Sequence, residues 1–242
     1  FGCRATQADG AALEGLLRRQ GLDSVDANQQ ADLVILNTCT VTATADDEVR
    51  QVSRRVHREN PNARILITGC YAQRAPEELA ALPGVLWVVG NSDKIRIPEL
   101  IAISNAAAPA PESYHGEIHV HDIFAEQQFL SAPVEDAPGD RTRPNLKVQD
   151  GCGNRCSFCI IPSVRGRSRS MPAAQIVEQL RPLAERYAEV VLSGINLGRW
   201  GRDLEGRLRI PGLIRLLLDE TPVQRLRLSS IEPMDFSDDL LG

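Results

Sequence analysis

The chain has 242 residues, a formal net charge of −5 at pH 7, 43% apolar and 24% charged residues. These proportions are ordinary for a globular protein with a buried core, and the length allows one or two domains. No apolar run approaches the roughly 18 residues of a membrane-spanning helix, and no signal peptide opens the chain. The six cysteines are therefore expected to be reduced thiols or metal ligands in a cytoplasmic protein, rather than a disulfide framework. A start at Phe1 and an end soon after a strand-like run predict a fragment lacking sequence at both ends.

The first hundred residues alternate between helical and strand-like segments. Leu13, Leu16 and Leu17 fall on one face of the first expected helix. Continuous apolar runs are typical of strands that are buried on both faces. The expected helices cover 7–20, 43–59, 76–82 and 93–102, the last interrupted by Pro98, and the expected strands cover 33–38, 64–69 and 85–90. This alternation predicts an open parallel α/β sheet.

Three cysteines occupy equivalent places in this expected sheet. Cys39 and Cys70 each follow a strand, and Cys3 precedes the first helix, where a further strand would end. Ligands of open parallel α/β sheets bind beyond the carboxyl ends of the strands, so we expect the three cysteines to form one site. The alternative is three structural cysteines, since free cysteine is often a core residue.

The composition changes over residues 104–142, which are rich in alanine and proline and predict a linker around a strand at 117–124. His115, His119 and His121 lie close together there, and solvent-facing positions explain them more simply than a metal cluster does. The expected domains are 1–125 and 144–242, joined by a linker over 126–143.

A second series of strands and helices is expected after the linker. The expected strands cover 146–150, 189–193 and 223–229, and the expected helices cover 172–187 and 211–219. This series corresponds to about half of a βα barrel. Residues 141–209 hold 13 basic and six acidic side chains, an excess that fits either a phosphate-facing surface or a solvated arginine-rich face.

The loop over 151–159 carries Cys152, Cys156 and Cys159 in a C-x₃-C-x₂-C spacing. Three thiolates this close can hold three corners of an iron–sulfur cluster, which normally has four cysteine ligands. One iron then has no protein ligand, much as a catalytic zinc keeps an open position for substrate. We expect the chemistry to start at that iron.

This spacing resembles the signature loop of radical S-adenosylmethionine (SAM) enzymes, in which Phe158 takes the place of the usual aromatic residue. Segments 2–7, 37–42 and 68–73 resemble the three cysteine motifs of the methylthiotransferase N-terminal domain, and 158–170 and 226–233 resemble the same family further along. The sequences around Cys39 and Cys70 are most similar to the branch that modifies N6-threonylcarbamoyladenosine (t6A) in tRNA. The resemblance implies that the later barrel strands and a C-terminal RNA-binding domain are missing.

The resemblance implies an N-terminal open parallel α/β sheet domain followed by roughly half of a radical SAM βα barrel. It also implies two 4Fe–4S clusters, a SAM cluster on Cys152, Cys156 and Cys159 and an auxiliary cluster on Cys3, Cys39 and Cys70. A radical generated from SAM would abstract hydrogen from C2 of the adenine, where a methylated sulfur from the auxiliary cluster would be inserted. The implied partners are tRNA and an electron donor such as flavodoxin or ferredoxin, with no membrane, and the protein is expected to be a monomer.

Further contacts with SAM or substrate follow from position in the family pattern. The loop 193–196 occupies the place of the family's SAM amino-group motif but departs from the usual Gly-Gly-Glu. The arginines after the cluster loop suit SAM or tRNA phosphates, or else a solvated turn. A carboxylate at 232 suits the SAM ribose or the substrate, or else a backbone cap. The residues concerned are Phe158, Arg165, Arg167, Arg169, Ser193, Gly194, Asn196 and Glu232.

Two alternatives stay open. One is the same chemistry on isopentenyladenosine in tRNA or on an aspartate of a ribosomal protein. The other is a non-catalytic nucleic-acid-binding module with structural zinc. Structural zinc sites are usually closed by four Cys or His ligands, and neither cysteine triad has an evident fourth partner.

Overall fold

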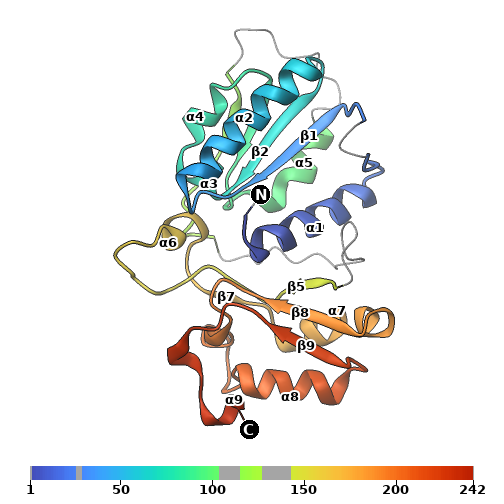
Figure 1. The fold of residues 1–242 in the computed structure, drawn as a ribbon, viewed down its shortest axis with the longest axis vertical. Helices are drawn as coiled ribbons and strands as arrows, with labels where there is room; N and C mark the ends of the chain where they lie inside the picture. The colour runs from blue at the N-terminus through green and yellow to red at the C-terminus, as the bar shows by residue number, and fades with distance from the viewer. Residues whose placement is uncertain (1, 26–28, 104–114, 127–142, 242) are drawn as a thin grey trace. The chain divides into compact units, whose positions relative to one another are not determined.

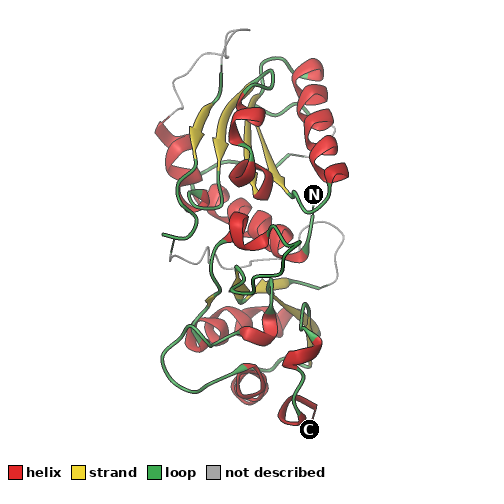
Figure 2. Ribbon diagram, turned by 90° about the vertical axis from the view of Figure 1, so that its left-hand side faces the viewer, coloured by secondary structure: helices red, strands yellow, loops and turns green. Residues whose placement is uncertain are grey.

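The computed structural model describes residues 2–25, 29–103, 115–126 and 143–241. The chain divides into two compact units, which Figure 1 colours along the chain and Figure 2 shows by secondary structure. The first unit comprises 1–6, 16–126 and 163–165, and the second comprises 7–15, 127–162 and 166–242. Nearly all of the expected linker lies outside the described residues. Within the described ranges, no helix is long and apolar enough to cross a membrane.

The first unit contains a parallel four-stranded sheet in the order β1-β2-β3-β4. Its strands are β1 (Leu33–Thr38), β2 (Arg64–Gly69), β3 (Val85–Val89) and β4 (Glu117–His119). The helices in or entering this unit are α1 (Arg4–Arg19), α2 (Ala43–Glu59), α3 (Cys70–Arg74), α4 (Pro76–Ala80), η1 (Lys94–Arg96) and α5 (Ile97–Ile103). The expected open parallel α/β sheet is confirmed.

The core of the first unit explains why these strands read as continuous apolar runs. Ile65 and Ile67 of β2 are completely buried, as is Val88 of β3. Val49 of α2 and Leu79 of α4 pack into the same cluster. Successive residues of β2 point to opposite faces of the sheet, and Ile65, Leu66 and Ile67 are all completely buried, so both faces of β2 are covered and alternation with polar residues would be unfavourable.

Several boundaries differ from the sequence-based expectation for local reasons. The first helix begins at Arg4 because Cys3 is its N-cap residue. Pro98 does not interrupt a helix, because the chain forms η1 first and Pro98 then falls in the first turn of α5, where a missing N–H is tolerated. The expected strand at 117–124 ends at His119, where its pairing with β3 stops.

The second unit contains a parallel three-stranded sheet in the order β5-β8-β9. Its strands are β5 (Asn145–Lys147), β8 (Glu189–Ser193) and β9 (Arg225–Leu228), and its main helices are α7 (Ala173–Arg186) and α8 (Ile210–Glu220). Leu146 and Leu192 of the sheet pack against Leu180, Leu213 and other helix residues. Successive parallel strands joined by helices are the expected partial βα barrel, which is confirmed.

The expected strand at 146–150 is divided between two sheets, and this was not predicted. Val148 still donates its N–H to Ser193 O at 2.9 Å, but its carbonyl accepts from Met171 N. The chain then forms β6 (Gln149–Asp150), which pairs antiparallel with β7 (Arg169–Ser170). The change of partner directs the chain from the barrel sheet into the cysteine loop that begins at Gly151.

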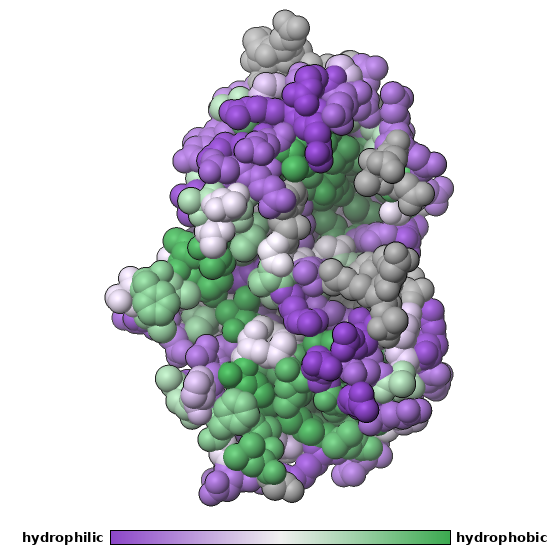
Figure 3. Space-filling view, viewed as in Figure 1, coloured by the Kyte–Doolittle hydropathy of each residue, from purple (hydrophilic) through white to green (hydrophobic). Residues whose placement is uncertain are grey.

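The remaining short elements are α6 (Ile161–Arg165), η2 (Leu197–Arg199), η3 (Pro233–Asp235) and α9 (Asp238–Leu241). All of them belong to the second unit except residues 163–165 of α6, which belong to the first. Figure 3 shows apolar surface in green on the viewed face of the second unit. Exposed apolar side chains after β9 include Met234, Phe236 and Leu241.

Glu189 begins β8 and joins three arginines that come from different parts of the second unit. Its carboxylate lies 3.1 Å from Arg143, 3.5 Å from Arg225 and 2.6 Å from Arg227. The Arg227 hydrogen bond, assisted by Arg143, lowers the pKa of Glu189 to about 2 against the opposing effect of burial. The native sheet therefore favours the charged form of this side chain.

We expect Glu189→Gln to be less stable than wild type at about pH 6, and the difference to disappear as the pH falls toward 2. Unfolded glutamate has a pKa of about 4.3, so this stabilisation is complete above that pH and is lost between it and the native value. Urea unfolding across this pH range measures the difference. The matched control is Glu185→Gln, because Glu185 is exposed and has no ion pair among the described residues. A difference that does not change with pH would contradict the prediction.

Candidate functional site

Cys39 and Cys70 follow neighbouring strand ends in the first unit. Strands β1 and β2 pair in parallel with Thr38 opposite Gly69, so each cysteine is the next residue on its own chain segment. Thr38 Oγ1 donates to Thr68 O at 2.6 Å and fixes the two ends to each other. Both cysteines are buried. The register of the sheet alone therefore brings them to the same edge.

Gly69 is required for this close approach. Its φ of 104° and ψ of −159° lie in a region that is essentially restricted to glycine. A Cβ at this position would lie 2.4 Å from Thr38 O and 2.7 Å from Thr38 N. The backbone that precedes Cys70 is thus in direct contact with the backbone that precedes Cys39.

Cys3 joins the same end of the sheet from helix α1. A Cβ on the preceding residue, Gly2, would lie 2.7 Å from Cys39 Cβ and 3.3 Å from Cys39 Sγ. The structure therefore gathers Cys3, Cys39 and Cys70, which are far apart in sequence, at the carboxyl ends of β1 and β2. Among the described residues, no three Cys, His, Asp or Glu side chains surround a point that could hold a single metal ion. A 4Fe–4S cluster binds each cysteine through a different iron, so its ligands need not converge on one point.

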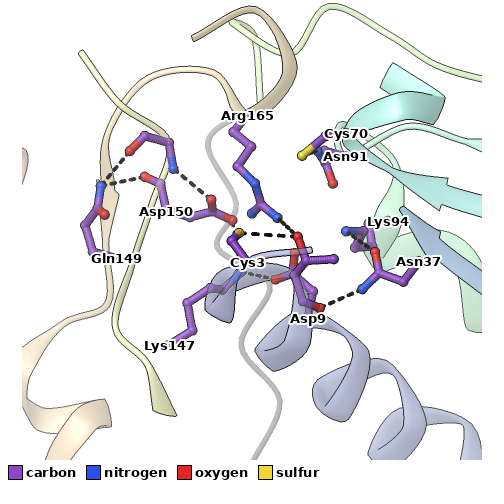
Figure 4. A network of polar contacts seen from close by, with 12 residues as sticks. Cys3, Asp9, Asn37, Cys70, Asn91, Lys94, Lys147, Gln149, Asp150 and Arg165 are labelled. Carbon is purple, nitrogen blue, oxygen red and sulfur yellow. Dashed lines mark hydrogen bonds and ion pairs between the residues drawn. The ribbon is translucent and has the colours of Figure 1, made fainter. Parts of the chain in front are cut away.

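Arg165 lies beside Cys3 in the first unit (Figure 4). Its side chain is 1% exposed, and Nη2 donates to Thr6 Oγ1 at 3.2 Å. Burial raises the pKa of the Cys3 thiol, but Arg165 and hydrogen bonds with Thr6 and Ala5 together outweigh it and leave the pKa below its usual value. The solvated-turn alternative is therefore wrong for Arg165, whereas Arg167 is exposed and Arg169 is half-buried.

Asn91 and Arg74 support the other two cysteines, and the sequence analysis missed both. Asn91 Nδ2 donates to Cys70 Sγ at 3.6 Å and to Val164 O at 2.7 Å. Thr40 is the residue after Cys39, and its Oγ1 accepts a hydrogen bond from Arg74 Nε at 2.8 Å. Arg74 Nη2 also lies 2.8 Å from a carboxylate oxygen of Asp46. Asn91 comes two residues after the end of β3 and directly after the strand expected at 85–90, and that position was the available signal.

The loop with Cys152, Cys156 and Cys159 lies in the second unit, directly after β6. Cys152 N donates to Gly166 O at 3.0 Å, and Cys159 N donates to Cys156 O at 3.1 Å. Cys156 is exposed and the other two are partly exposed. Phe158, the aromatic residue of this loop, is 91% exposed. Backbone hydrogen bonds thus hold the shape of the loop, while the side chains of its cysteines and of Phe158 stay at least partly accessible.

The loop after β8 contains two polar atoms that fit a ligand. Ser193 is completely buried and Asn196 is 2% exposed. Among the described residues, Ser193 Oγ and Asn196 Oδ1 are buried without a hydrogen-bond partner. Buried polar atoms normally have partners, so these two suit polar groups of a bound molecule at the carboxyl end of the strand. Gly194, between them in sequence, is also buried.

The remaining predicted residues have simple surroundings. Glu232 is exposed and precedes η3, but its side chain makes no capping hydrogen bond, so the capping alternative is wrong. His121 Nδ1 lies 2.8 Å from a carboxylate oxygen of Asp93. Burial raises the pKa of Asp93, but hydrogen bonds from His121 and Ser92 outweigh this effect and leave the pKa below its usual value. His119 lies 3.5 Å from Glu117. His115 and His121 are exposed, and His119 is half-buried.

Comparisons with known proteins match both units. Residues 1–90 match the family described as "Uncharacterized protein family UPF0004", and 146–238 match the radical SAM superfamily. Proteins named "Threonylcarbamoyladenosine tRNA methylthiotransferase MtaB" from Bacillus subtilis and Aquifex aeolicus are each 36% identical over 100% of this chain and 52% and 57% of their own length. Over its whole length the chain is thus similar to tRNA methylthiotransferases, and residues 146–238 match the radical SAM superfamily.

Proteins with other printed names also match. A "tRNA-2-methylthio-N(6)-dimethylallyladenosine synthase" from Novosphingobium aromaticivorans is 33% identical over 100% of this chain and 54% of its own length. The radical SAM methyltransferase TsrM from Kitasatospora setae, solved with cobalamin and a [4Fe-4S] cluster, aligns with a TM-score of 0.66 at 17% identity, over 96% of this chain and 54% of its own. That likeness shows the fold. The chain spans about half the length of the curated relatives it matches.

We expect Gly69→Ala to lower the free energy of unfolding by about 3 kcal/mol or more, since it adds a clash with Thr38 to the cost of the backbone conformation. The matched control is Gly21→Ala. Gly21 has a similar φ of 83°, but a Cβ there would meet nothing within 4 Å. That variant should lose only about 1–2 kcal/mol. Urea unfolding measures both, and equal losses would show that Gly69 is not needed for the contact between the two strand ends.

Proposed function

We propose that the protein carrying this chain is a radical SAM enzyme that inserts a methylthio group at C2 of N6-threonylcarbamoyladenosine in tRNA. The observation that carries the proposal is the in-register pairing of Thr38 with Gly69, which sets Cys39 and Cys70 side by side in addition to the C-x₃-C-x₂-C loop. The loop alone would suffice for a radical SAM enzyme with one cluster. A second cysteine triad at the ligand-binding end of a parallel sheet requires a further role, and sulfur transfer supplies one.

The donor sets support two 4Fe–4S clusters and SAM as cofactors. Cys152, Cys156 and Cys159 would hold the SAM cluster, and the gathered triad of the first unit would hold the auxiliary cluster. Three thiolates leave one iron of each cluster open, for SAM in one case and for a sulfur species in the other. When bound, SAM and its cluster supply the one-electron cleavage that generates a radical able to attack an unreactive C–H bond.

The chain's own residues would hold and orient these groups. Ser193 Oγ and Asn196 Oδ1 are buried acceptors that suit the SAM amino group, although they replace the usual family motif. Exposed Phe158 is free to cover the cofactor, and Glu232 is accessible to the SAM ribose or the substrate. Arg165 places positive charge beside Cys3, and Asn91 donates to Cys70, so both would stabilise thiolates that bind iron.

The substrate assignment rests on the relatives. Four relatives named for t6A are 34–36% identical to this chain, whereas the dimethylallyladenosine synthases among the relatives are 28–33% identical. The excess of basic residues over 141–209 supports a polyanionic substrate, and exposed Arg167 would contact its phosphates or SAM. Dimethylallyladenosine in tRNA is the second candidate, because those relatives match along the whole chain.

The proposal includes two domains, partners and a location. Residues 1–125 would form the auxiliary-cluster domain and 144–242 part of the radical SAM domain, with 126–143 linking them. The reaction needs one electron for each SAM cleaved, so we propose a donor such as flavodoxin or ferredoxin. The enzyme would act as a cytoplasmic monomer on tRNA.

A transfer assay with competing substrates tests the proposed function. The longest natural form of the protein is reconstituted anaerobically and supplied with SAM, reductant and sulfide. Anticodon stem-loops with t6A or with isopentenyladenosine, and the ribosomal protein, are offered together. We expect methylthiolation of t6A, detected by nucleoside mass spectrometry, to exceed that of the other two at least about tenfold, as one missed recognition contact allows. Preference for either of the other substrates would contradict the assignment.

Single cysteine variants separate the two triads. Cys39→Ser should abolish methylthio transfer while cleavage of SAM to 5′-deoxyadenosine continues, because the cluster loop is intact. Cys156→Ser should abolish both activities. The two readouts come from one reaction mixture by chromatography. Methylthio transfer that survives Cys39→Ser would show that the first unit does not supply the sulfur.

A further inference from the structure

Gln149 is a buried side chain to which the proposed function assigns no role. It is completely buried on the short strand β6, two residues before the cysteine loop starts to turn at Gly151. Its amide makes hydrogen bonds through both ends, as Figure 4 shows in part. All of these bonds lie within the second unit.

The donor end of Gln149 holds the base of the cluster loop. Nε2 donates to Gly151 O at 2.7 Å and to Asp150 O at 2.9 Å. It also contacts Ser168 Oγ at 2.9 Å, on the segment that returns from the loop. The chain segments on both sides of the cysteine loop are therefore hydrogen-bonded to the same amide nitrogen.

The acceptor end of Gln149 holds the loop after β8. Oε1 accepts from Asn196 N at 2.9 Å. The same loop carries Ser193 Oγ and Asn196 Oδ1, the buried atoms without a partner among the described residues. The Gln149 side chain thus holds the loop after β8, which carries these two atoms, in a fixed position relative to the backbone of the cysteine loop.

Gly194 shows how closely this loop packs on Gln149. A Cβ at Gly194 would lie 2.8 Å from Gln149 Oε1 and 2.9 Å from Gln149 Cβ. A larger residue would separate Asn196 N from its acceptor. The Ser-Gly-Ile-Asn sequence and Gln149 therefore work together, and an amide is the group that can donate at one end and accept at the other.

We propose that Gln149 is a positioning residue for SAM, which sets the loop of Ser193 and Asn196 at the distance from the cluster loop that the cofactor needs. The inference rests on the proposed function, because it takes SAM as the ligand of that loop. Gln149 itself would make no contact with the cofactor. Its effect should appear in the affinity for SAM rather than in cluster content.

Two substitutions of similar length separate the two ends of the amide. Gln149→Glu keeps an acceptor for Asn196 N but removes the donor to Gly151 and Asp150. Gln149→Met removes both. The exposed residue Gln175 of α7 provides the matched control, Gln175→Met. The longest natural form of the protein is reconstituted and titrated anaerobically with SAM, and the change in the EPR spectrum of the reduced SAM cluster reports binding.

We expect Gln149→Met to raise the Kd for SAM about tenfold or more, as the loss of buried hydrogen bonds allows. Gln149→Glu should raise it by only about threefold, because the bond to Asn196 is kept. Iron content should stay near wild type in both variants, whereas thermal stability should fall in both, because buried backbone groups lose their partner and Gln149→Glu also buries a carboxylate. Gln175→Met should match wild type throughout.

Other results would overturn the inference. An unchanged Kd in Gln149→Met would show that the loop does not depend on the amide. A Kd that rises only in parallel with a loss of iron, or that rises more in Gln149→Glu than in Gln149→Met at equal iron content, would assign Gln149 a purely structural role. A wild-type chain that holds iron but gives no SAM-dependent spectral change would contradict the proposed function itself, and the inference with it.

Discussion

The parallel register of β1 and β2 is the constraint on which the candidate auxiliary site depends. Thr38 lies opposite Gly69, and the glycine lets the two backbones touch at the point where both strands end. Every parallel sheet collects its strand ends along one edge, but here the next residue on each strand is a cysteine. A shift of one residue would move Cys39 and Cys70 apart by about 3.3 Å along the strands and would exchange the side chains that one strand presents to each face of the sheet. Core packing and the geometry of the site are thus fixed by the same pairing.

A second constraint acts where the barrel sheet gives way to the cluster loop. Val148 is bonded to β8 through its N–H and to the segment after β7 through its carbonyl, so the chain changes sheet at this residue. Gln149 then secures both the cysteine loop and the loop after β8 with one amide. Loops that carry function are usually the most mobile parts of a fold, and here buried hydrogen bonds restrain them.

The sequence was informative where a pattern has one structural solution. Apolar runs predicted β1 and β2 to the residue, because strands covered on both faces tolerate little else. It was silent where the outcome depends on distant partners. Arg165 looked like one of three alternating surface arginines, yet it is buried beside Cys3, and nothing local encodes that contact. Gln149 was read as part of a continuous strand, because the change of sheet at Val148 depends on residues some twenty and forty positions further along.

Iron and sulfide counting after anaerobic reconstitution tests most directly whether the chain holds two clusters. Wild type should bind about eight irons, and the triple variants Cys3/Cys39/Cys70→Ala and Cys152/Cys156/Cys159→Ala should bind about four each, as two 4Fe–4S clusters require. The remaining cluster should respond to SAM in the EPR spectrum only when the C-x₃-C-x₂-C loop is intact. About four irons in both wild type and the Cys3/Cys39/Cys70→Ala variant would contradict the existence of an auxiliary cluster and, with it, the proposed source of the transferred sulfur.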